Sequence, residues 1–298
     1  MKISPVTPNF LSGEFLDRLS DSYPPEEIRQ FLRLLFEEYL GWSKMQLHLS
    51  GGTEIPAGPL PMFYAALSRL QAGEPLQYIL GKAWFDGMAL KVGPGVLIPR
   101  PETEEMCSII GNDHREIKDE VMTVLDIGTG SGCIAIDLKR RFPNARVTAV
   151  EVSEIALFMA EENAREQQCD INFVLADVLN MDEDLVTGAY HIIVSNPPYV
   201  TGNDRLKMRR NVTEHEPPMA LFVPDESPLL FYHAIARFAV THLGPGGHLY
   251  FEINEKYGNE IKTLQENLSL NGVEILKDLN GKERFTRAAS GVPSVRHS

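Results

Sequence analysis

The chain has 298 residues, of which 43% are hydrophobic and 23% are charged. These fractions are typical of a globular protein, and no apolar stretch approaches the roughly 20 residues that a membrane-spanning helix needs. The net charge of −13 argues against a function that depends on extensive contacts with nucleic acid phosphates. Residues 1–19 lack the basic start and apolar block of a secretory signal. The three cysteines show no metal-ligand spacing and favour free thiols, so we expect a cytoplasmic protein.

The N-terminal region, residues 1–80, is predicted to form a small helical domain. One helix begins at Pro24-Pro25, carries apolar residues at helical spacing and ends at Gly41. A second helix is expected over residues 60–71. Residues 81–100 are predicted to be a linker that contains a β-hairpin, with its turn at Asp86-Gly87.

Residues 96–104 contain two prolines directly before a predicted helix at residues 102–110. Pro99 and Pro101 would stiffen this segment, and acidic residues in the first turn suit the dipole of the helix. Taken alone, the pattern indicates only the start of a helix framed by prolines.

The rest of the chain, from residue 121, alternates predicted strands and helices, which is typical of an α/β sheet. A helix starting at Ser227-Pro228 is followed by a glycine-rich turn at residues 244–247 and a strand at 248–253. A further helix at 257–268 and two strands, 273–279 and 284–289, complete the prediction.

A glycine-rich loop joins the first of these strands to a helix, in the sequence Asp126-Ile127-Gly128-Thr129-Gly130-Ser131-Gly132. Glycine lets the backbone turn tightly and approach a ligand, and the helix behind it presents free N–H groups. The loop lacks the two-residue gap of the dinucleotide fingerprint Gly-x-Gly-x-x-Gly, which argues against NAD.

Polar side chains follow four successive predicted strands: Asp126, Glu151, Asp177 and Asn196. Ligands of an open α/β sheet bind outside the carboxyl ends of its strands, so we expect these residues to form one site. Glu151 lies about twenty residues beyond the glycines, where a carboxylate can accept both ribose hydroxyls of an adenosine. By itself, Glu151 could equally be a surface acid beside the helix cap Ser153.

The motif Asn196-Pro197-Pro198-Tyr199 follows an apolar strand and suits the alkylation of a planar nitrogen. The Asn196 side-chain oxygen and the Pro197 carbonyl can accept the two N–H groups of an amide or an exocyclic amine. The prolines stiffen the loop, and the Tyr199 ring offers a π face. The four residues alone are also compatible with an ordinary Asn-Pro turn.

With these motifs the chain resembles the class I S-adenosylmethionine-dependent methyltransferases, and among them the PrmC/HemK protein-glutamine N5-methyltransferases. Three segments carry the resemblance, and the third is the most discriminating: Asp126–Gly132, Asn196–Tyr199 and Val96–Glu104. The implied fold is a Rossmann-like seven-stranded sheet with a small N-terminal helical domain. Residues 101–298 would form the methyltransferase domain, and residues 1–80 would recognise the substrate.

The resemblance implies that S-adenosylmethionine is the cofactor and assigns roles to individual residues. The glycine loop would hold the methionine end, Glu151 the ribose, and Asp177 with Val178 the adenine. Glu151 stands where aspartate is common in the family, and the position of Val178 is often aromatic. The cofactor set is Asp126, Gly128, Thr129, Gly130, Ser131, Gly132, Glu151, Asp177, Val178 and Asn196. The substrate set is Asn196, Pro197, Pro198, Tyr199, Arg100, Glu102 and Thr103, with Asn196, Pro197 and Tyr199 as catalytic residues.

The activity implied is methyl transfer to the glutamine N5 of the Gly-Gly-Gln loop in class 1 peptide chain release factors. We expect no metal, no nucleic acid partner, no membrane association and a monomer. Alternatives are methylation of adenine N6, methylation of another protein glutamine, an NAD-dependent oxidoreductase, and a binding module without catalysis. The basic run at residues 205–210 is either a solvated loop or a docking site for substrate.

Overall fold

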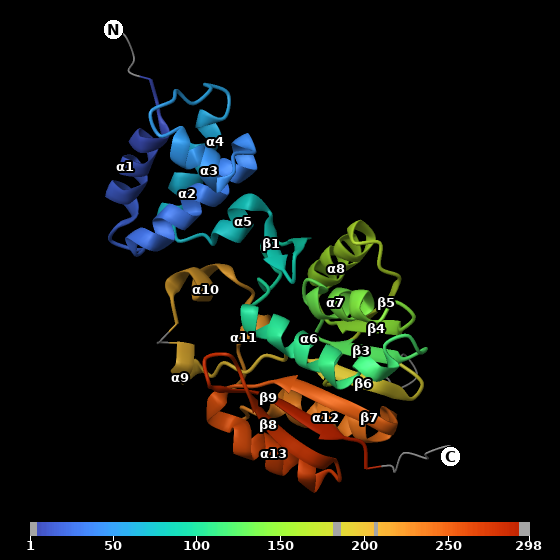
Figure 1. The fold of residues 1–298 in the computed structure, drawn as a ribbon. Helices are drawn as coiled ribbons and strands as arrows, with labels where there is room; N and C mark the ends of the chain where they lie inside the picture. The colour runs from blue at the N-terminus through green and yellow to red at the C-terminus, as the bar shows by residue number, and fades with distance from the viewer. Residues whose placement is uncertain (1–4, 181–185, 206–207, 292–298) are drawn as a thin grey trace. The chain divides into compact units, whose positions relative to one another are not determined.

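The computed structural model describes residues 5–180, 186–205 and 208–291 (Figure 1). The chain divides into two compact units, one of residues 1–81 with 209–215 and one of residues 82–208 with 216–298. The hairpin therefore counts with the second unit. The segment 209–215, which the sequence analysis assigned to the methyltransferase domain, counts with the first.

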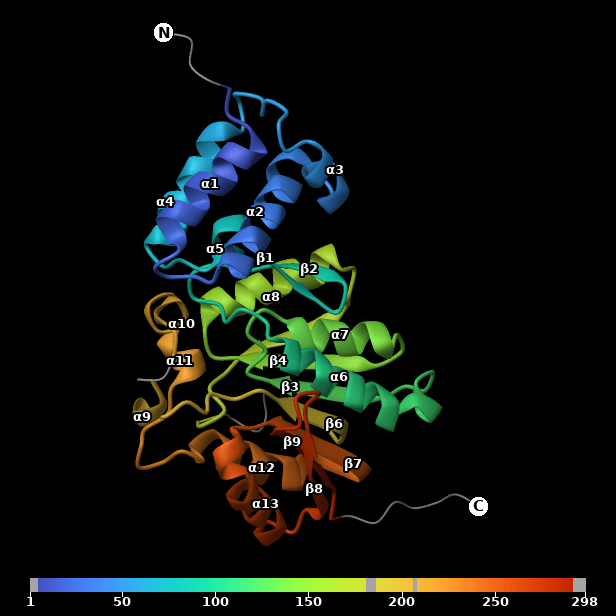
Figure 2. The same cartoon turned by 60° about the vertical axis from the view of Figure 1, so that its left-hand side comes forward.

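The first unit is a bundle of helices (Figure 2), and its core consists of apolar side chains. Phe15, Leu35, Phe36 and Phe63 are almost completely buried in that core. The helix that ends at Gly41 is confirmed, because Gly41 adopts the left-handed conformation (φ 66°) at its C-terminus. The short helices were not predicted. The helices of this unit are α1 (Pro8–Leu19), α2 (Pro25–Leu40), α3 (Lys44–Leu49), α4 (Leu60–Gln71), α5 (Leu76–Leu80) and α10 (Arg210–His215).

The arginines of the basic run at residues 205–210 each interact with a different side chain. Arg209 forms an ion pair with Glu27 of α2 at 3.0 Å. Arg210 pairs with Glu214 one turn further along α10, at 2.8 Å. In the second unit, the Arg205 guanidinium lies 5.1 Å from the centre of a phenylalanine ring. Lys207 lies outside the described residues, and the docking role of the run stays a prediction.

The second unit contains a seven-stranded sheet in the order β5-β4-β3-β6-β7-β9-β8, which confirms the predicted fold class. The strands from β5 to β7 are parallel, and β9 is antiparallel to both of its neighbours. The bounds are β3 (Thr123–Ile127), β4 (Arg146–Glu151), β5 (Ile171–Leu175), β6 (Tyr190–Ser195), β7 (Leu243–Glu252), β8 (Asn271–Lys277) and β9 (Glu283–Ala289). A separate hairpin of β1 (Lys82–Phe85) and β2 (Met88–Lys91) turns through Asp86 and Gly87, both at positive φ, as predicted.

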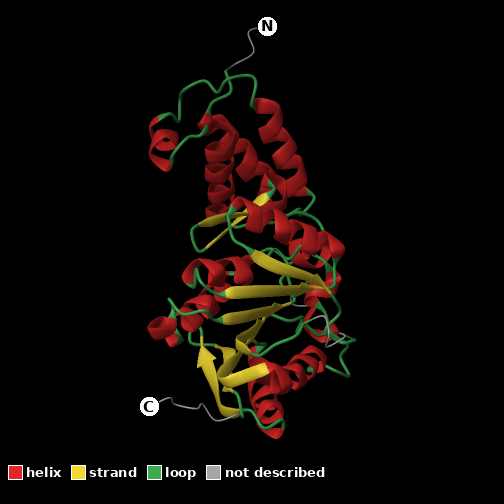
Figure 3. Cartoon of the chain, turned by 90° about the vertical axis from the view of Figure 1, so that its right-hand side faces the viewer, coloured by secondary structure: helices red, strands yellow, loops and turns green. Residues whose placement is uncertain are grey.

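Helices cover both faces of the sheet (Figure 3). Side chains alternate along a strand, so Val124 packs in the core on one face and Leu125 in the core on the other. The first face is covered by α6 (Pro101–Asp113), α7 (Cys133–Arg141) and α8 (Glu154–Glu166). The second is covered by α12 (Leu230–His242) and α13 (Gly258–Asn267). Shorter elements are α9 (Gly202–Arg205), α11 (Pro218–Leu221) and two 3-10 helices, Arg115–Ile117 and Glu255–Tyr257.

Two predicted boundaries are wrong. The glycine-rich residues 244–247 lie within β7 instead of preceding it, because Leu243 already pairs with Tyr190 of β6. His248 pairs with Ile192, so the intervening residues form an irregularity in the ladder, not a separate turn. Helix α12 begins at Leu230, because residues 224–227 form a turn of their own before it.

Because of the buried His114 in the second unit, we expect the protein to lose stability as the pH falls. His114 is 6% exposed, and its Nε2 lies 3.2 Å from the Tyr250 hydroxyl. Burial, followed by the neighbouring His248, lowers the pKa of His114 to about 4. Between pH 6.5 and pH 4 the unfolded chain therefore binds a proton that the folded chain does not, and stability falls as the pH falls. Urea unfolding of wild type and His114→Gln should show the wild type losing about 2 kcal/mol relative to the variant between pH 7.5 and 4.5. A constant difference between the two proteins would contradict this.

Among the described residues, no helix is both long and apolar enough to cross a membrane.

Candidate functional site

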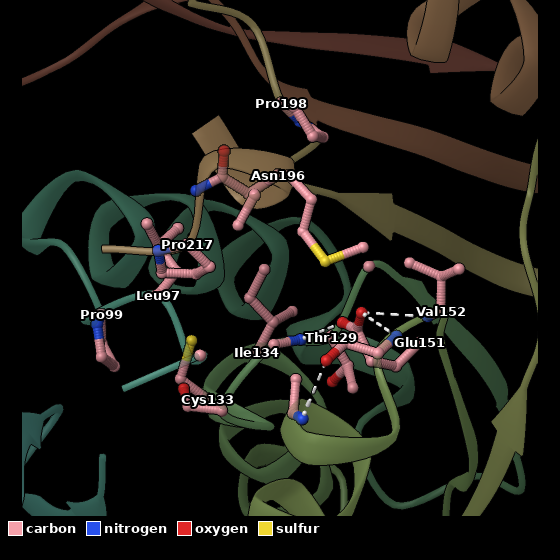
Figure 4. A pocket seen from close by; sticks show the side chains of 18 of the residues that line it. Leu97, Pro99, Thr129, Cys133, Ile134, Glu151, Val152, Asn196, Pro198 and Pro217 are labelled. Carbon is pink, nitrogen blue, oxygen red and sulfur yellow. Dashed lines mark hydrogen bonds between the residues drawn. The ribbon is translucent and has the colours of Figure 1, made fainter. Parts of the chain in front are cut away.

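A cavity of about 280 Å³ lies in the second unit, at the carboxyl ends of β3, β4 and β6. Side chains from the loops after these strands surround it (Figure 4). Its volume is near the lower end of the range for small-molecule sites. Ten of the predicted site residues line it: Arg100, Thr103, Gly128, Thr129, Gly130, Ser131, Glu151, Asp177, Asn196 and Pro198.

The glycine loop opens its backbone toward the cavity. Gly128 and Gly130 adopt positive φ angles of 76° and 58°, which favour glycine. A Cβ atom on either residue would meet no other atom within 4 Å, so a ligand can approach the backbone here. Gly132 has a different role, because a Cβ there would come within 3.1 Å of the Ala160 side chain in α8. It lets the loop pack closely against that helix.

Asp126 holds the glycine loop from within the protein. It is completely buried, and its Oδ2 accepts hydrogen bonds from the Thr129 hydroxyl at 2.6 Å and the Ala135 N–H at 3.2 Å. Burial raises the pKa of Asp126 to about 7. Asp126 therefore shapes the loop, and it is not among the described residues that line the cavity.

Glu151 forms hydrogen bonds with the backbone of two loops that line the cavity. Its side chain accepts three backbone N–H groups, from Gly130 at 2.8 Å, Val152 at 2.9 Å and Ser153 at 3.0 Å. A carboxylate offers about four lone-pair positions, so capacity for a ligand hydroxyl remains. The glutamate side chain is long enough to connect the loop after β3 with the loop after β4.

Asn196 lies at the end of a hydrogen-bonded chain of buried groups. Its Nδ2 donates to the Thr103 hydroxyl at 3.2 Å. That hydroxyl donates to Glu252 Oε2 at 2.7 Å. Thr103 and Glu252 are 2% and 1% exposed, so both hydrogen bonds are shielded from water. These two hydrogen bonds thus connect the Asn196 side chain, which lines the cavity, to Glu252 at the end of β7.

Tyr199 reaches the same glutamate from the other end of the motif. Its hydroxyl donates to Glu252 Oε1 at 3.3 Å, and its ring packs against the core on the second face of the sheet. Burial, followed by the charge of Glu252, raises the pKa of Tyr199 well above its usual value. The hydroxyl end of Tyr199 is therefore held within the protein, and the contact of its partly buried ring with substrate stays a prediction.

The outer wall of the cavity is held by an ion pair. Arg100 Nη2 lies 2.6 Å from Glu216 Oε1, and the Ile98 N–H donates to Glu216 Oε2 at 3.1 Å. Glu216 is buried, so it joins the proline-rich segment 96–104 to the segment that follows α10. Leu97, Pro99 and Pro217 from these two segments line the cavity (Figure 4).

Removing this ion pair should destabilise the protein measurably. We expect Glu216→Ala to lower the free energy of unfolding by about 2 kcal/mol, because Arg100 and the Ile98 N–H lose a buried acceptor while Arg100 remains partly hydrated. Glu214→Ala is the matched control, since it removes an exposed ion pair with Arg210 and should leave the free energy of unfolding almost unchanged. Urea unfolding of both variants measures the difference in the free energy of unfolding. Equal losses would show that the Arg100–Glu216 ion pair stabilises the protein no more than a surface ion pair does.

The remaining predicted site residues lie outside the cavity lining. Val178 lines a neighbouring groove beside α12, and Pro197 is buried. Glu102 is partly buried in the first turn of α6, where its charge acts on Glu252. The sequence analysis missed Glu252 and did not assign a role to Glu216. Glu252 follows the rule that identified the other polar residues, since it is the last residue of β7.

The cavity fits S-adenosylmethionine in its chemistry. Glu151 can accept a ribose hydroxyl, and the open faces of Gly128 and Gly130 admit a chain close to the backbone. Ile134 and Phe231 supply apolar lining for a nucleoside. Asp177 follows the third strand and lines the same cavity.

The chain is similar to known proteins over most of its length. Residues 14–81 match the family model described as the PrmC N-terminal domain, and residues 114–216 match the Methyltransferase small domain. The release factor glutamine methyltransferase of Bacteroides thetaiotaomicron is 41% identical over 94% of this chain and 99% of its own. That of Flavobacterium psychrophilum is 37% identical over 92% and 96%. A methyltransferase structure from Pyrococcus furiosus shares the fold, with a TM-score of 0.50 at 21% identity over 70% of this chain and 90% of its own.

Proposed function

The chain belongs to the release factor glutamine methyltransferases, and on that premise we propose that it methylates class 1 peptide chain release factors. The methyl donor is S-adenosylmethionine, and the acceptor is the side-chain amide nitrogen (N5) of the glutamine in their Gly-Gly-Gln loop. The observation that supports this most strongly is that one cavity is lined by both the glycine loop with Glu151 and the Asn196 amide.

The cofactor end of the cavity is built from the loops after β3, β4 and β5. Bound S-adenosylmethionine supplies an electrophilic methyl group on a sulfonium. Four residues that line the cavity would hold it: the backbone of Gly128 and Gly130 would face its methionine end, Glu151 would accept from the ribose, and Asp177 would lie on the adenine side. Because the glycines are already in their positive-φ conformations, little reorganisation is needed on binding.

The substrate end uses Asn196 to orient the glutamine amide. An amide nitrogen shares its lone pair with the carbonyl, so it attacks only when its N–H groups are held and the lone pair is aimed at the methyl carbon. The Asn196 oxygen accepts one N–H, and the Pro197 carbonyl accepts the other. Fixing two reactants in this way supplies most of the rate through proximity and orientation.

The proton of the methylated nitrogen leaves to water, because the N-alkylated amide is strongly acidic until it loses that proton. The buried carboxylate of Glu252 accepts the hydroxyls of Thr103 and Tyr199, so we assign it no role as a base. The three free cysteines suit an enzyme that acts in the reducing cytoplasm, where release factors function.

Substrate choice can be tested with methyl-labelled S-adenosylmethionine and three separate acceptors. We expect label in a purified class 1 release factor, and none in its Gly-Gly-Gln loop variant with Gln→Ala or in duplex DNA. Label in DNA would support an adenine methyltransferase instead. Equal label in the release factor and its loop variant would point to a different glutamine.

A further inference from the structure

We propose that Glu252 and Thr103 form a relay that fixes the orientation of the Asn196 amide, with its oxygen available to the substrate. The relay makes Thr103 and Glu252 positioning residues for methyl transfer, acting through Asn196. The proposal rests on the proposed function, because it concerns the acceptor for the substrate N–H.

The direction of each hydrogen bond follows from the groups involved. A threonine hydroxyl has a single hydrogen, and Thr103 donates it to Glu252 Oε2 at 2.7 Å, while Tyr199 donates to the other carboxylate oxygen. The hydroxyl then has only lone pairs left for Asn196. It must therefore face the amide nitrogen, at 3.2 Å, and not the amide oxygen.

The surroundings of Glu252 support its role as an acceptor. Tyr199 donates to its second oxygen, and Arg284, in β9, places a positive charge nearby. Burial raises the pKa of Glu252, while the Thr103 hydroxyl and the Arg284 charge act in the opposite direction. Both ends of the Asn196–Tyr199 motif thus converge on one carboxylate. Arg284 lies in the strand predicted at residues 284–289, to which the sequence analysis gave no role in the site.

The relay matters because the two ends of an asparagine side chain have opposite hydrogen-bonding character. With Nδ2 held by Thr103, Oδ1 remains as the acceptor, and among the described residues it forms no hydrogen bond. If the Asn196 amide were reversed, its NH₂ group would face the N–H of the substrate glutamine, and neither group could accept a hydrogen bond from the other. The substrate would then lose the interaction that aims its lone pair.

Thr103→Val tests the relay with little change in shape, because valine replaces only the hydroxyl with a methyl group. We expect kcat for the release factor to fall about ten- to a hundredfold, since Nδ2 loses its acceptor and the amide can reverse. The Kd for S-adenosylmethionine should stay near wild type. Thr103→Ser, which keeps the hydroxyl, should restore kcat.

Thr286→Val is the matched control. Thr286 is also completely buried in the second unit, but its hydroxyl has no hydrogen-bond partner among the described residues, so kcat should not change. Nitrogen-15 spectra add a readout that does not depend on turnover. The Asn196 side-chain NH₂ signal, assigned by its loss in Asn196→Ala, should exchange faster with water in Thr103→Val than in wild type.

The outcomes separate the relay from the proposed function. Wild-type kcat in Thr103→Val, or an equal loss in Thr103→Ser, would overturn the relay while the wild-type enzyme still methylates the release factor. Absence of methylation by the wild-type enzyme would instead overturn the proposed function. In that case, unchanged exchange of the Asn196 amide in Thr103→Val would overturn the relay independently, and faster exchange would support it.

Discussion

Asn196→Ala is expected to methylate the release factor about a hundred- to a thousandfold more slowly than wild type, with a nearly unchanged Kd for S-adenosylmethionine. The variant removes the amide oxygen that accepts a substrate N–H, an interaction that matters most when the nitrogen attacks. The loop itself should keep its conformation, because its prolines and the Tyr199–Glu252 hydrogen bond remain. Single-turnover kinetics and calorimetric titration with the cofactor measure the two quantities separately.

Asn144→Ala is a suitable control for this experiment. Asn144 is an exposed asparagine whose amide donates to a backbone carbonyl on the surface, so neither rate nor affinity should change. A near-wild-type rate for Asn196→Ala would remove Asn196 from the catalytic set. A parallel loss of cofactor affinity would mean that Asn196 serves mainly to bind the cofactor.

Glu151→Ala is expected to raise the Kd for S-adenosylmethionine about a hundredfold. The substitution removes the acceptor proposed for the ribose and also leaves the N–H groups of Gly130, Val152 and Ser153 without their carboxylate. The cofactor side of the cavity thus loses both a contact and the support of its two loops. Calorimetric titration of the purified variant gives the Kd directly.

Glu154→Ala provides the matched control, because Glu154 is an exposed glutamate three residues further along, in the first turn of α8. Its removal should leave the Kd unchanged and cost at most about 0.5 kcal/mol of stability through the helix dipole. Equal affinities of Glu151→Ala and wild type would show that the ribose is held elsewhere.

The rule that polar residues after parallel strands converge on one site accounts for much of what could be predicted. It placed Glu151, Asp177 and Asn196 at the same cavity, because the parallel pairing of β5, β4, β3 and β6 brings these strand ends together. The same rule includes Asp126, yet its carboxylate turns into the protein and supports the glycine loop. The position of a residue at a strand end therefore predicts that it lies near the cavity. Whether its side chain points into the cavity depends on local hydrogen bonds.

The relay could not be predicted, because it joins residues that are far apart in the chain. Thr103 and Glu252 belong to α6 and β7, and no local pattern indicates that their side chains meet. The hydrogen bond from Tyr199 to the same carboxylate could not be predicted for the same reason, since only the folded structure shows that Glu252 lies within reach of its hydroxyl. In the first unit, α1 was not predicted, although Thr7 as N-cap and Pro8 at the first helical position are recognisable signals in the sequence.

If this cavity directs a methyl group to one amide nitrogen, tandem mass spectrometry of the methylated release factor will locate that group. We predict a single added methyl group on the side chain of the Gly-Gly-Gln glutamine, and none after the reaction with Asn196→Ala. A methyl group on a backbone atom, on a lysine or on a glutamine elsewhere would contradict the account. So would methylation of the loop glutamine at the wild-type rate by the variant.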